Sequence, residues 1–332
     1  MKRYLFIGGF ALAAVLFTAM PAFTLAQAQT FPSRLVKIVV PYTPGSLTDA
    51  AARSVGQRLS EIWKQPVVIE NRPGAGTTLG AEYVAKAAPD GYTLLFSDHP
   101  TYVITPHLFS KLRYNVLTDF APITIVFRTL PVFAVSNSVT AKDFREFLAY
   151  AKANPGRLSY ASFGNGSFPH VATEQLKQMA GVDLVHVPYK GGAPAITDLL
   201  AGRVALLMAS YGTFAQREKA GKVRIIAAAT QKRLPIRPDL PTVAESGVPG
   251  YSMHVWFAMA ATAGTPPPVV EKIHADVVTI LGDPGPEGFS EKFMKPQAVE
   301  PGGNTPEEFA AIIRTEYADW GRVVRSIGVT LD

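Results

Sequence analysis

Short apolar segments alternate with amphipathic ones along most of this chain, and that alternation restricts the possible fold more than any other feature. The apolar segments are four to six residues long and rich in β-branched side chains, which is typical of buried strands. The amphipathic segments between many of them have helical spacing. Such alternation predicts α/β domains with mostly parallel sheets. The predicted strands are residues 36–40, 67–70, 92–96, 123–127, 132–136, 158–162, 184–187, 204–208 and 223–228.

Two of the amphipathic segments show the side that should pack on a sheet. In each, apolar residues recur every three or four positions, so that they share one face of a helix. Gly181 provides a stop for the second of these helices. The residues expected to be buried are Ala51, Val55, Leu59 and Ile62 in the first helix, and Ala172, Leu176 and Met179 in the second.

Length and composition limit the class of protein. At roughly 100–200 residues per domain, a chain of 332 residues suggests two domains. The net charge is +6, but no basic stripe interleaved with aromatic residues is present, so a nucleic-acid partner is not expected. The absence of cysteine excludes disulfides, thiol catalysis, zinc–thiolate sites and attachment of lipid to a lipobox cysteine.

The first 28 residues have the pattern of a cleaved secretory signal. Lys2 and Arg3 precede the apolar run 5–20, and Ala26-Gln27-Ala28 supplies the small residues that a signal peptidase requires. The alternative is a membrane anchor, but the run is shorter than the roughly 20 residues of a span. We therefore predict a signal peptide over 1–28 and a soluble mature protein in the periplasm.

Ligands of open α/β sheets bind beyond the carboxyl ends of the strands, so the loops there are the place to look for a site. The first loop joins strand 36–40 to a helix and contains Gly45, with Ser46 or Thr48 as the helix N-cap. The free N–H groups of that helix start would suit a carboxylate. Asp49 either contacts a ligand amine or supports its own helix, and Tyr42 either frames the pocket or belongs to the core.

Three further loops have the same character. The second contains Gly74, Gly76 and Gly80, whose spacing is one residue off the dinucleotide fingerprint, and Thr77 as a helix cap. The third follows strand 158–162 and combines two glycines with a helix start. The fourth presents a tyrosine. The candidate ligand residues in the third and fourth loops are Gly164, Gly166, Ser167, His170 and Tyr189.

The sequence does not favour an enzyme. A hydrolase could use Ser167 and His170, but no G-x-S-x-G elbow is present and neither residue has an evident orienting partner. The histidines form no H-x-x-x-H pair and there is no phosphate-binding loop. We expect no catalytic residue, no metal and no cofactor. A binding protein that signals to a membrane sensor would have the same ligand site as one that delivers cargo, so that alternative stays open.

The chain also resembles the substrate-binding proteins of tripartite tricarboxylate transporters, also called the Bug family. The similar segments occur in family order and span nearly the whole mature chain. They include ENRPGAG, PDGYTL, HVPYKG and PTVAESGVPGY, and they cover residues 33–41, 44–49, 70–76, 89–94, 119–123, 163–170, 186–191 and 241–251.

This resemblance implies a two-domain periplasmic binding protein, a Venus flytrap of type II-like architecture, joined by crossing strands near 125–135 and 253–260. Domain 1 would comprise 29–127 and 255–332, and domain 2 would comprise 128–254. It further implies a monomer that binds a small carboxylate (an amino acid, a di- or tricarboxylate or an aromatic acid) and delivers it to membrane transporter subunits. The family's binding positions correspond here to Gly45, Ser46, Thr48, Asp49, Gly166, Ser167 and His170, and further to Thr77 and Asp98.

Three positions depart from the family pattern. Ser46 replaces a second glycine, and Ala205 stands where an aspartate is common. His99 and Pro100 replace small residues that usually follow the strand 92–96. The last departure is expected to alter the far wall of the pocket and the choice of ligand.

Overall fold

The computed structural model describes Met1 and residues 31–331. The predicted signal peptide therefore lies, apart from Met1, outside the described residues. From Pro32 onward the chain forms one compact unit that contains two β-sheets. No helix in the described part combines the length and apolar character that a membrane span requires.

The first sheet has six strands in the order β11-β4-β10-β3-β1-β2. β1 runs parallel to both β2 and β3, while β10 runs antiparallel to β3 and β4. Because β1 and β3 are parallel, the loops that follow them leave from the same edge of the sheet. The strands are β1 Val36–Val40, β2 Val67–Asn71, β3 Thr93–Asp98, β4 Phe120–Thr129, β10 Val255–Thr262 and β11 Glu300–Pro301.

The second sheet has five strands in the order β7-β6-β8-β5-β9. β6 is parallel to β7 and β8, and β5 is antiparallel to β8 and β9. The side chains of β5 and most of those of β8 and β9 are buried, as expected for strands covered on both faces. The strands are β5 Pro131–Ser136, β6 Ser159–Ser162, β7 Val185–Pro188, β8 Leu206–Ser210 and β9 Val223–Ala228.

The expectation of α/β architecture with two sheets is confirmed, but the sheets are mixed rather than mostly parallel. β5 and β10, the strands reached by the two crossings, run antiparallel to their neighbours, and the two-residue β11 is also antiparallel to β4. The chain passes from β4 into β5 through Leu130 alone, and it returns from β9 to β10 through residues 229–254. A strand reached by such a crossing enters its sheet against the direction of the βαβ strands, and the sequence pattern of a strand does not reveal that direction.

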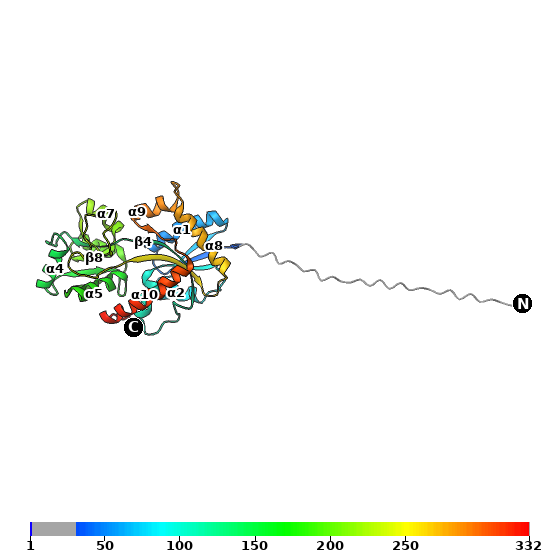
Figure 1. Ribbon diagram of the computed structural model, residues 1–332, viewed down its shortest axis with the longest axis horizontal. Helices are drawn as coiled ribbons and strands as arrows, with labels where there is room; N and C mark the ends of the chain where they lie inside the picture. The colour runs from blue at the N-terminus through cyan, green and yellow to red at the C-terminus, as the bar shows by residue number, and fades with distance from the viewer. Residues whose placement is uncertain (2–30, 332) are drawn as a thin grey trace. The chain divides into compact units, whose positions relative to one another are not determined.

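Helices cover both sheets. In Figure 1, α4, α5 and α7 surround the sheet that contains β8, whereas α1, α2 and α8 surround the other sheet. The helices are α1 Leu47–Trp63, α2 Thr78–Ala85, α3 His99–Val103, α4 Phe144–Ala153, α5 Phe168–Ala180, α6 Gly192–Leu200, α7 Tyr211–Lys219, α8 Pro267–Gly282, α9 Lys295–Gln297 and α10 Pro306–Ile327, with shorter turns at Ala75–Thr77, Thr105–His107 and Ser290–Met294.

The predicted buried faces of α1 and α5 are correct except at their last positions. Ile62 is 41% exposed, and Trp63 is buried instead, with its Nε1 donating to Asp276 Oδ2 at 2.5 Å. Met179 is 40% exposed, and Ala180 is buried in its place. In both helices the prediction ended on an i+3 step, whereas the buried face continues through the i+4 step from Leu59 and from Leu176.

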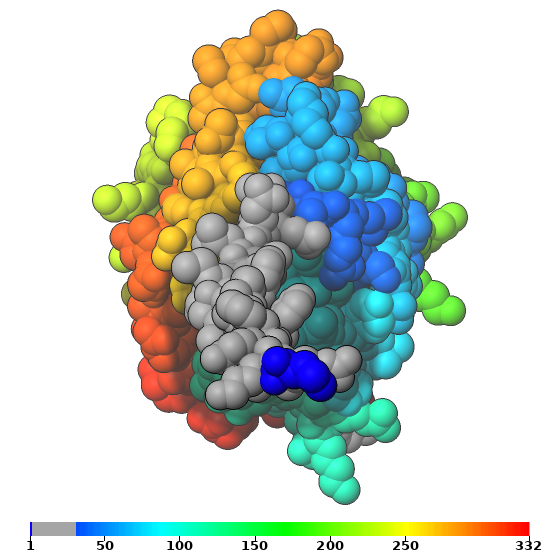
Figure 2. All heavy atoms as spheres, turned by 90° about the vertical axis from the view of Figure 1, so that its right-hand side faces the viewer, coloured from blue at the N-terminus to red at the C-terminus, as the bar shows by residue number. Residues whose placement is uncertain are grey.

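Segments that are far apart in the sequence pack side by side. Arg58 of α1 forms an ion pair with Asp283, just after α8, at 2.7 Å. Figure 2 shows this region, where light-blue residues of the early chain lie against the orange residues that follow α8. The C-terminal third of the chain thus completes the layer that covers the first sheet.

The turn after β11 provides a stability test. Gly302 N–H donates to Val126 O at 2.9 Å, and a Cβ on Gly302 would lie 1.9 Å from Ile125 O. Gly302→Ala must therefore displace backbone, and we expect a loss of about 1–3 kcal/mol or more in the free energy of unfolding measured by urea titration.

The matched control is Gly282→Ala at the end of α8, where a Cβ would meet no atom within 4 Å. That variant is expected to be neutral or slightly more stable, because alanine favours the helix over glycine. Equal stability of the two variants would contradict the close approach at Gly302.

Candidate ligand-binding site

The loops that follow β1, β2 and β3 are joined by a chain of hydrogen bonds. Tyr42 Oη donates to Asp98 Oδ1 at 2.7 Å. Thr101 Oγ1 lies 3.1 Å from the same Asp98 oxygen and 3.0 Å from Thr77 Oγ1. The structure thus brings together Tyr42, Thr77 and Asp98, three predicted site residues from three different loops.

The loop before α2 has an unusual backbone. Ala75, Gly76 and Thr77 follow one another with φ values of 45°, 58° and 80°, in the left-handed region that is unfavourable for residues with a Cβ. Thr77 occupies the N-cap position of α2, as predicted, but its side chain makes no capping bond. Its hydroxyl faces Thr101 instead. Strained backbone of this kind persists only where the surroundings fix it, and it concentrates at binding sites.

The carboxylate of Asp49 is occupied by donors of the protein itself. It accepts from the N–H of Gly45 at 2.9 Å, from Asn71 Nδ2 at 2.9 Å and from Arg53 Nε at 3.0 Å. Burial raises the pKa of this carboxyl, but the bonds from Arg53, Gly45 and Asn71 outweigh it and hold the pKa below its usual range. The geometry therefore favours the structural interpretation of Asp49, which holds the loop closed.

The start of α1 presents backbone donors. Ser46 is the N-cap, and its Oγ accepts from the N–H of Asp49 at 3.1 Å. Leu47 and Thr48 lie in the first turn, where N–H groups have no carbonyl four residues back and the helix dipole is positive. Gly45 has φ +82°, and a Cβ there would meet no atom within 4 Å. The loop tip is therefore open in front of the helix start.

In the second sheet, the loop after β6 is closed by Ser167. The Ser167 hydroxyl donates to Gly164 O at 2.6 Å, and the Ser167 N–H donates to the same oxygen at 3.1 Å. Ser167 is the N-cap residue of α5, as predicted, but it makes no side-chain cap bond. Gly164 and Gly166, at φ +125° and +75°, permit this tight turn.

His170 lies behind that loop. Its Nδ1 accepts from the N–H of Gly166 at 3.0 Å, and its ring stacks on His186 with centroids 4.0 Å apart. Burial lowers the pKa of His170, which keeps the ring neutral and Nδ1 free to accept. The structure thus gives His170 a positioning contact with Gly166.

Tyr189 contributes to the same region through its backbone. Its N–H donates to Ser162 O at 3.1 Å, next to the Gly164 turn. Its hydroxyl donates to Asp198 Oδ2 at 2.7 Å, and burial together with that carboxylate raises the pKa of Tyr189 to about 12. The hydroxyl is therefore engaged within its own sheet layer.

Two leucines connect the loops of the two sheets. A Cβ on Gly166 would lie 2.6 Å from Leu108 Cδ1 and 2.7 Å from Leu331 Cδ1, and a Cβ on Gly76 would lie 3.4 Å from Leu331 Cδ1. Leu331 is held by its N–H, which donates to Leu108 O at 2.8 Å. The end of the chain thus packs between the loop before α2 and the loop before α5.

A buried polar cluster lies beside this region, and the sequence did not reveal it. Trp256 is 1% exposed and donates from Nε1 to Glu316 Oε2 at 2.9 Å. His99 and His254 approach the same carboxylate. Burial lowers the pKa of His99 to about 4. The one sequence signal for this cluster was His99, which departs from the family pattern. Its contact with Glu316 could not be predicted, because the two residues are distant in sequence.

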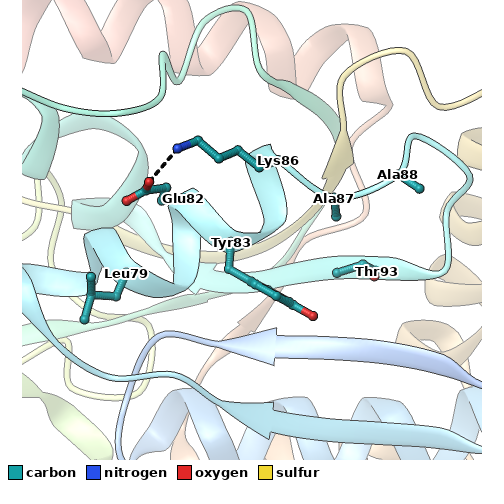
Figure 3. Close-up of a pocket in the computed structure, with 7 residues that line it drawn as sticks. All are labelled: Leu79, Glu82, Tyr83, Lys86, Ala87, Ala88 and Thr93. Carbon is teal, nitrogen blue, oxygen red and sulfur yellow. Dashed lines mark hydrogen bonds and ion pairs between the residues drawn. The ribbon is translucent and has the colours of Figure 1, made fainter.

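A surface pocket of about 500 Å³ lies elsewhere (Figure 3). Lys86 and Glu82 form an ion pair on one side of it, and Thr93 lies at the amino end of β3. The predicted ligand residue Asp98 lies at the carboxyl end of that strand, five positions further along the chain. We therefore do not assign this pocket to the ligand. Its lining residues are Leu79, Glu82, Tyr83, Lys86, Ala87, Ala88 and Thr93.

Comparisons with known proteins agree with this architecture. The profile of the tripartite tricarboxylate transporter family receptor matches residues 51–329. The chain is 35% identical to the UPF0065 protein in the tcbD–tcbE intergenic region of Pseudomonas sp. (strain P51), covering 89% of this chain and 86% of that protein. It is 33% identical to protein BugT of Bordetella pertussis, covering 92% and 93%.

Two solved structures are similar over nearly their whole length. R. palustris Rpa4515 with adipate is 35% identical, with a TM-score of 0.82 over 90% of this chain and 99% of that one. MatC (Rpa3494) from Rhodopseudomonas palustris with bound malate is 31% identical, with a TM-score of 0.79 over 89% and 100%.

This chain belongs to the tripartite tricarboxylate transporter receptor family, the Bug-type periplasmic solute-binding proteins. The predicted α/β binding-protein fold is thereby confirmed, as is the expectation of a binding protein rather than an enzyme.

The carboxyl of Asp98 provides a pH test. Burial raises its pKa to about 6, and the bonds from Tyr42 and Thr101 offset part of that effect. The folded protein then binds this proton more tightly than the unfolded chain, whose carboxyl has the ordinary value of 3.8. The protonated carboxyl of Asp98 therefore makes its full contribution to the free energy of unfolding below about pH 4. That contribution is lost as the pH rises to about 6.

Asp98→Asn should therefore gain stability relative to the wild type as the pH rises from 4 to 7, in urea titrations at each pH. The control is Asp319→Asn on the exposed face of α10, which removes a carboxylate and leaves Asp98 in place. If the difference in the free energy of unfolding between the wild type and Asp98→Asn is constant across this pH range, the pKa of Asp98 is not raised.

Proposed function

We propose that this protein captures a small carboxylate between the loops of its two sheets and delivers it to the membrane subunits of a tripartite tricarboxylate transporter. The observation that carries the proposal is the pair of helix starts, α1 and α5, each placed after the carboxyl end of a parallel strand by a glycine-containing loop. The relatives whose structures hold adipate and malate support the same ligand chemistry.

One carboxylate group would bind at the start of α1. Its oxygens would accept from the backbone N–H groups of Leu47 and Thr48, in front of the open Gly45 tip. Arg53 neutralises the buried Asp49 from behind, so that the acidic side chain does not repel an anion at the loop. The Ser46 hydroxyl, which already caps the helix, narrows the same tip.

A second acidic or polar group of the ligand would bind at the start of α5. Pro169 has no N–H, and the N–H of Ser167 is bonded to Gly164 O, so the available donors are those of Phe168 and His170. Gly166 and the His170 ring would set the position of this helix start without contacting the ligand directly. Two such helix ends suit a dicarboxylate better than a monocarboxylate.

We further propose that the two sheets belong to separate domains, residues 29–127 with 255–332 and residues 128–254, that close on the ligand. Supporting this division, the chain passes between the sheets at Leu130 and again just before Val255. An open form would bind the carboxylate at α1, and closure about these two crossings would bring α5 onto it, as in other periplasmic binding proteins.

The export signal and the assembly state complete the proposal. Residues 1–28 would direct the chain to the periplasm and be cleaved after Ala28, and the mature protein would act as a monomer. The basic start at Lys2 and Arg3 and the small residues Ala26 and Ala28 support the export step.

A thermal-shift screen of the mature protein tests the ligand class. Dicarboxylates such as adipate and malate, monocarboxylates, amino acids and aromatic acids would each be compared with the matched amide. An acid present at 100 times its dissociation constant stabilises by about 2.7 kcal/mol and raises the melting temperature, whereas its amide should not. If no carboxylate shifts the melting temperature and native mass spectrometry finds no co-purified acid, the proposal fails.

Leu47→Pro tests the contact at α1. Proline fits the first helical position, and Ser46 at φ −68° and ψ 161° already has the conformation required before proline. The variant therefore loses one N–H with little change of backbone. Because a hydrogen bond to a charged group contributes about 1.5–3 kcal/mol, affinity for the acid found in the screen should fall about 10- to 100-fold.

Leu47→Ala is the matched control, since it removes the side chain and keeps the N–H. Isothermal titration of the acid into both variants separates the effect of the lost N–H from the effect of the lost side chain. If Leu47→Pro binds as tightly as Leu47→Ala, the start of α1 does not hold the carboxylate.

A further inference from the structure

Three side chains from distant parts of the chain converge behind the proposed ligand site. His99 is the first residue of α3, His254 precedes β10, and Glu316 lies on α10. His99 Nε2 is 3.0 Å from Glu316 Oε2, and His254 Nε2 is 2.9 Å from Glu316 Oε1. One nitrogen or oxygen atom from each residue lies within 4.8 Å of the other two.

A second observation concerns His99 alone. Its side chain is 0% exposed, and neither ring nitrogen has hydrogen-bond geometry toward a partner, although Nε2 lies 3.0 Å from Glu316 Oε2. Buried polar atoms without a partner are rare and require an explanation. Edge contacts with Trp256, Trp320 and Phe168 hold the ring, with centroids 5.1, 5.2 and 5.9 Å away. The ring is thus fixed with Nε2 close to the carboxylate but without the geometry of a hydrogen bond to it.

We propose that His99, His254 and Glu316 bind a divalent transition-metal ion, with Zn²⁺ as the best match. Two imidazole nitrogens and one carboxylate oxygen are ligands that zinc prefers, whereas Ca²⁺ and Mg²⁺ prefer oxygen. Zinc bonds of about 2.0–2.2 Å in tetrahedral geometry place neighbouring donor atoms about 3.4 Å apart, which the present spacings reach with small side-chain adjustments.

The surroundings fit an ion held by three protein ligands. Trp256 Nε1 donates to Glu316 Oε2 and thereby orients the carboxylate, as second partners of metal ligands do. His254 is half exposed, so an ion can enter from its side and a water molecule can complete the coordination. His254 ends the segment that returns from the second sheet, and the ion would tie this segment to α10.

The site shares no residue with the proposed carboxylate contacts at α1 and α5. Its test is therefore independent of the proposed function. Zinc binding would be measured on the mature protein after removal of any polyhistidine tag and after stripping with a chelator. The two measurements are isothermal titration with Zn²⁺ and competition against a chromophoric zinc chelator.

We expect one Zn²⁺ per chain, and a melting temperature that rises with Zn²⁺. His254→Gln and Glu316→Gln should each weaken binding at least about tenfold, a loss typical of damage to a metal site. The control His274→Gln, on α8 and outside the cluster, should bind zinc like the wild type. Because His254 is half exposed, its variant should retain the fold, which circular dichroism checks.

Cobalt provides a readout that zinc lacks. Co²⁺ bound by the wild type should show visible d–d absorption that is lost in His254→Gln and retained in His274→Gln. If the wild type binds no stoichiometric zinc, or if His254→Gln binds as well as His274→Gln, the cluster is a hydrogen-bonded core around Glu316 and the metal proposal is wrong.

Discussion

The pairing of β10 with β3 and β4 determines how the binding face is assembled. β10 enters the first sheet antiparallel to β3, with Phe257 opposite Asp98. The amino end of β10 therefore lies at the carboxyl end of β3, on the edge where the loops after β1 and β3 emerge. In consequence, the segment that returns from the second sheet ends beside the ligand loops, and His254 reaches the same place as His99. In another register, the segment before β10 would not lie beside the loops that follow β1 and β3, and His254 would not lie near His99.

Polar side chains around the loops mainly shape the backbone. Asp49 fixes Gly45, Ser167 closes the turn at Gly164, and His170 holds Gly166. What remains directed outward is the backbone at the helix starts, whose partial charges are set by peptide geometry and do not depend on protonation. In the proposed site, a carboxylate would be recognised through these fixed dipoles, and the side chains along the walls would distinguish one acid from another.

The sequence predicted the strands and the loops well because these depend on local patterns. The predicted strand 36–40 coincides with β1, and strand 223–228 coincides with β9. Sequence could not predict that β5 and β10 run antiparallel, because direction depends on where the chain returns. Nor could it predict the partners of Asp49 or His170, which are set by side-chain geometry. The cluster at Glu316 was missed for a related reason, since its members are separated by up to 217 positions and meet only through the fold.

The position of Leu331 has a practical consequence for work with this protein. Its side chain fills the space between Gly76 and Gly166, and its N–H is bonded to Leu108. A purification tag or a fluorescent reporter fused after Asp332 would be separated from this contact by a single residue. Because Leu331 packs against both loops, a reporter attached there would disturb the contact between them and would itself change the distance between Gly76 and Gly166 that it was meant to record.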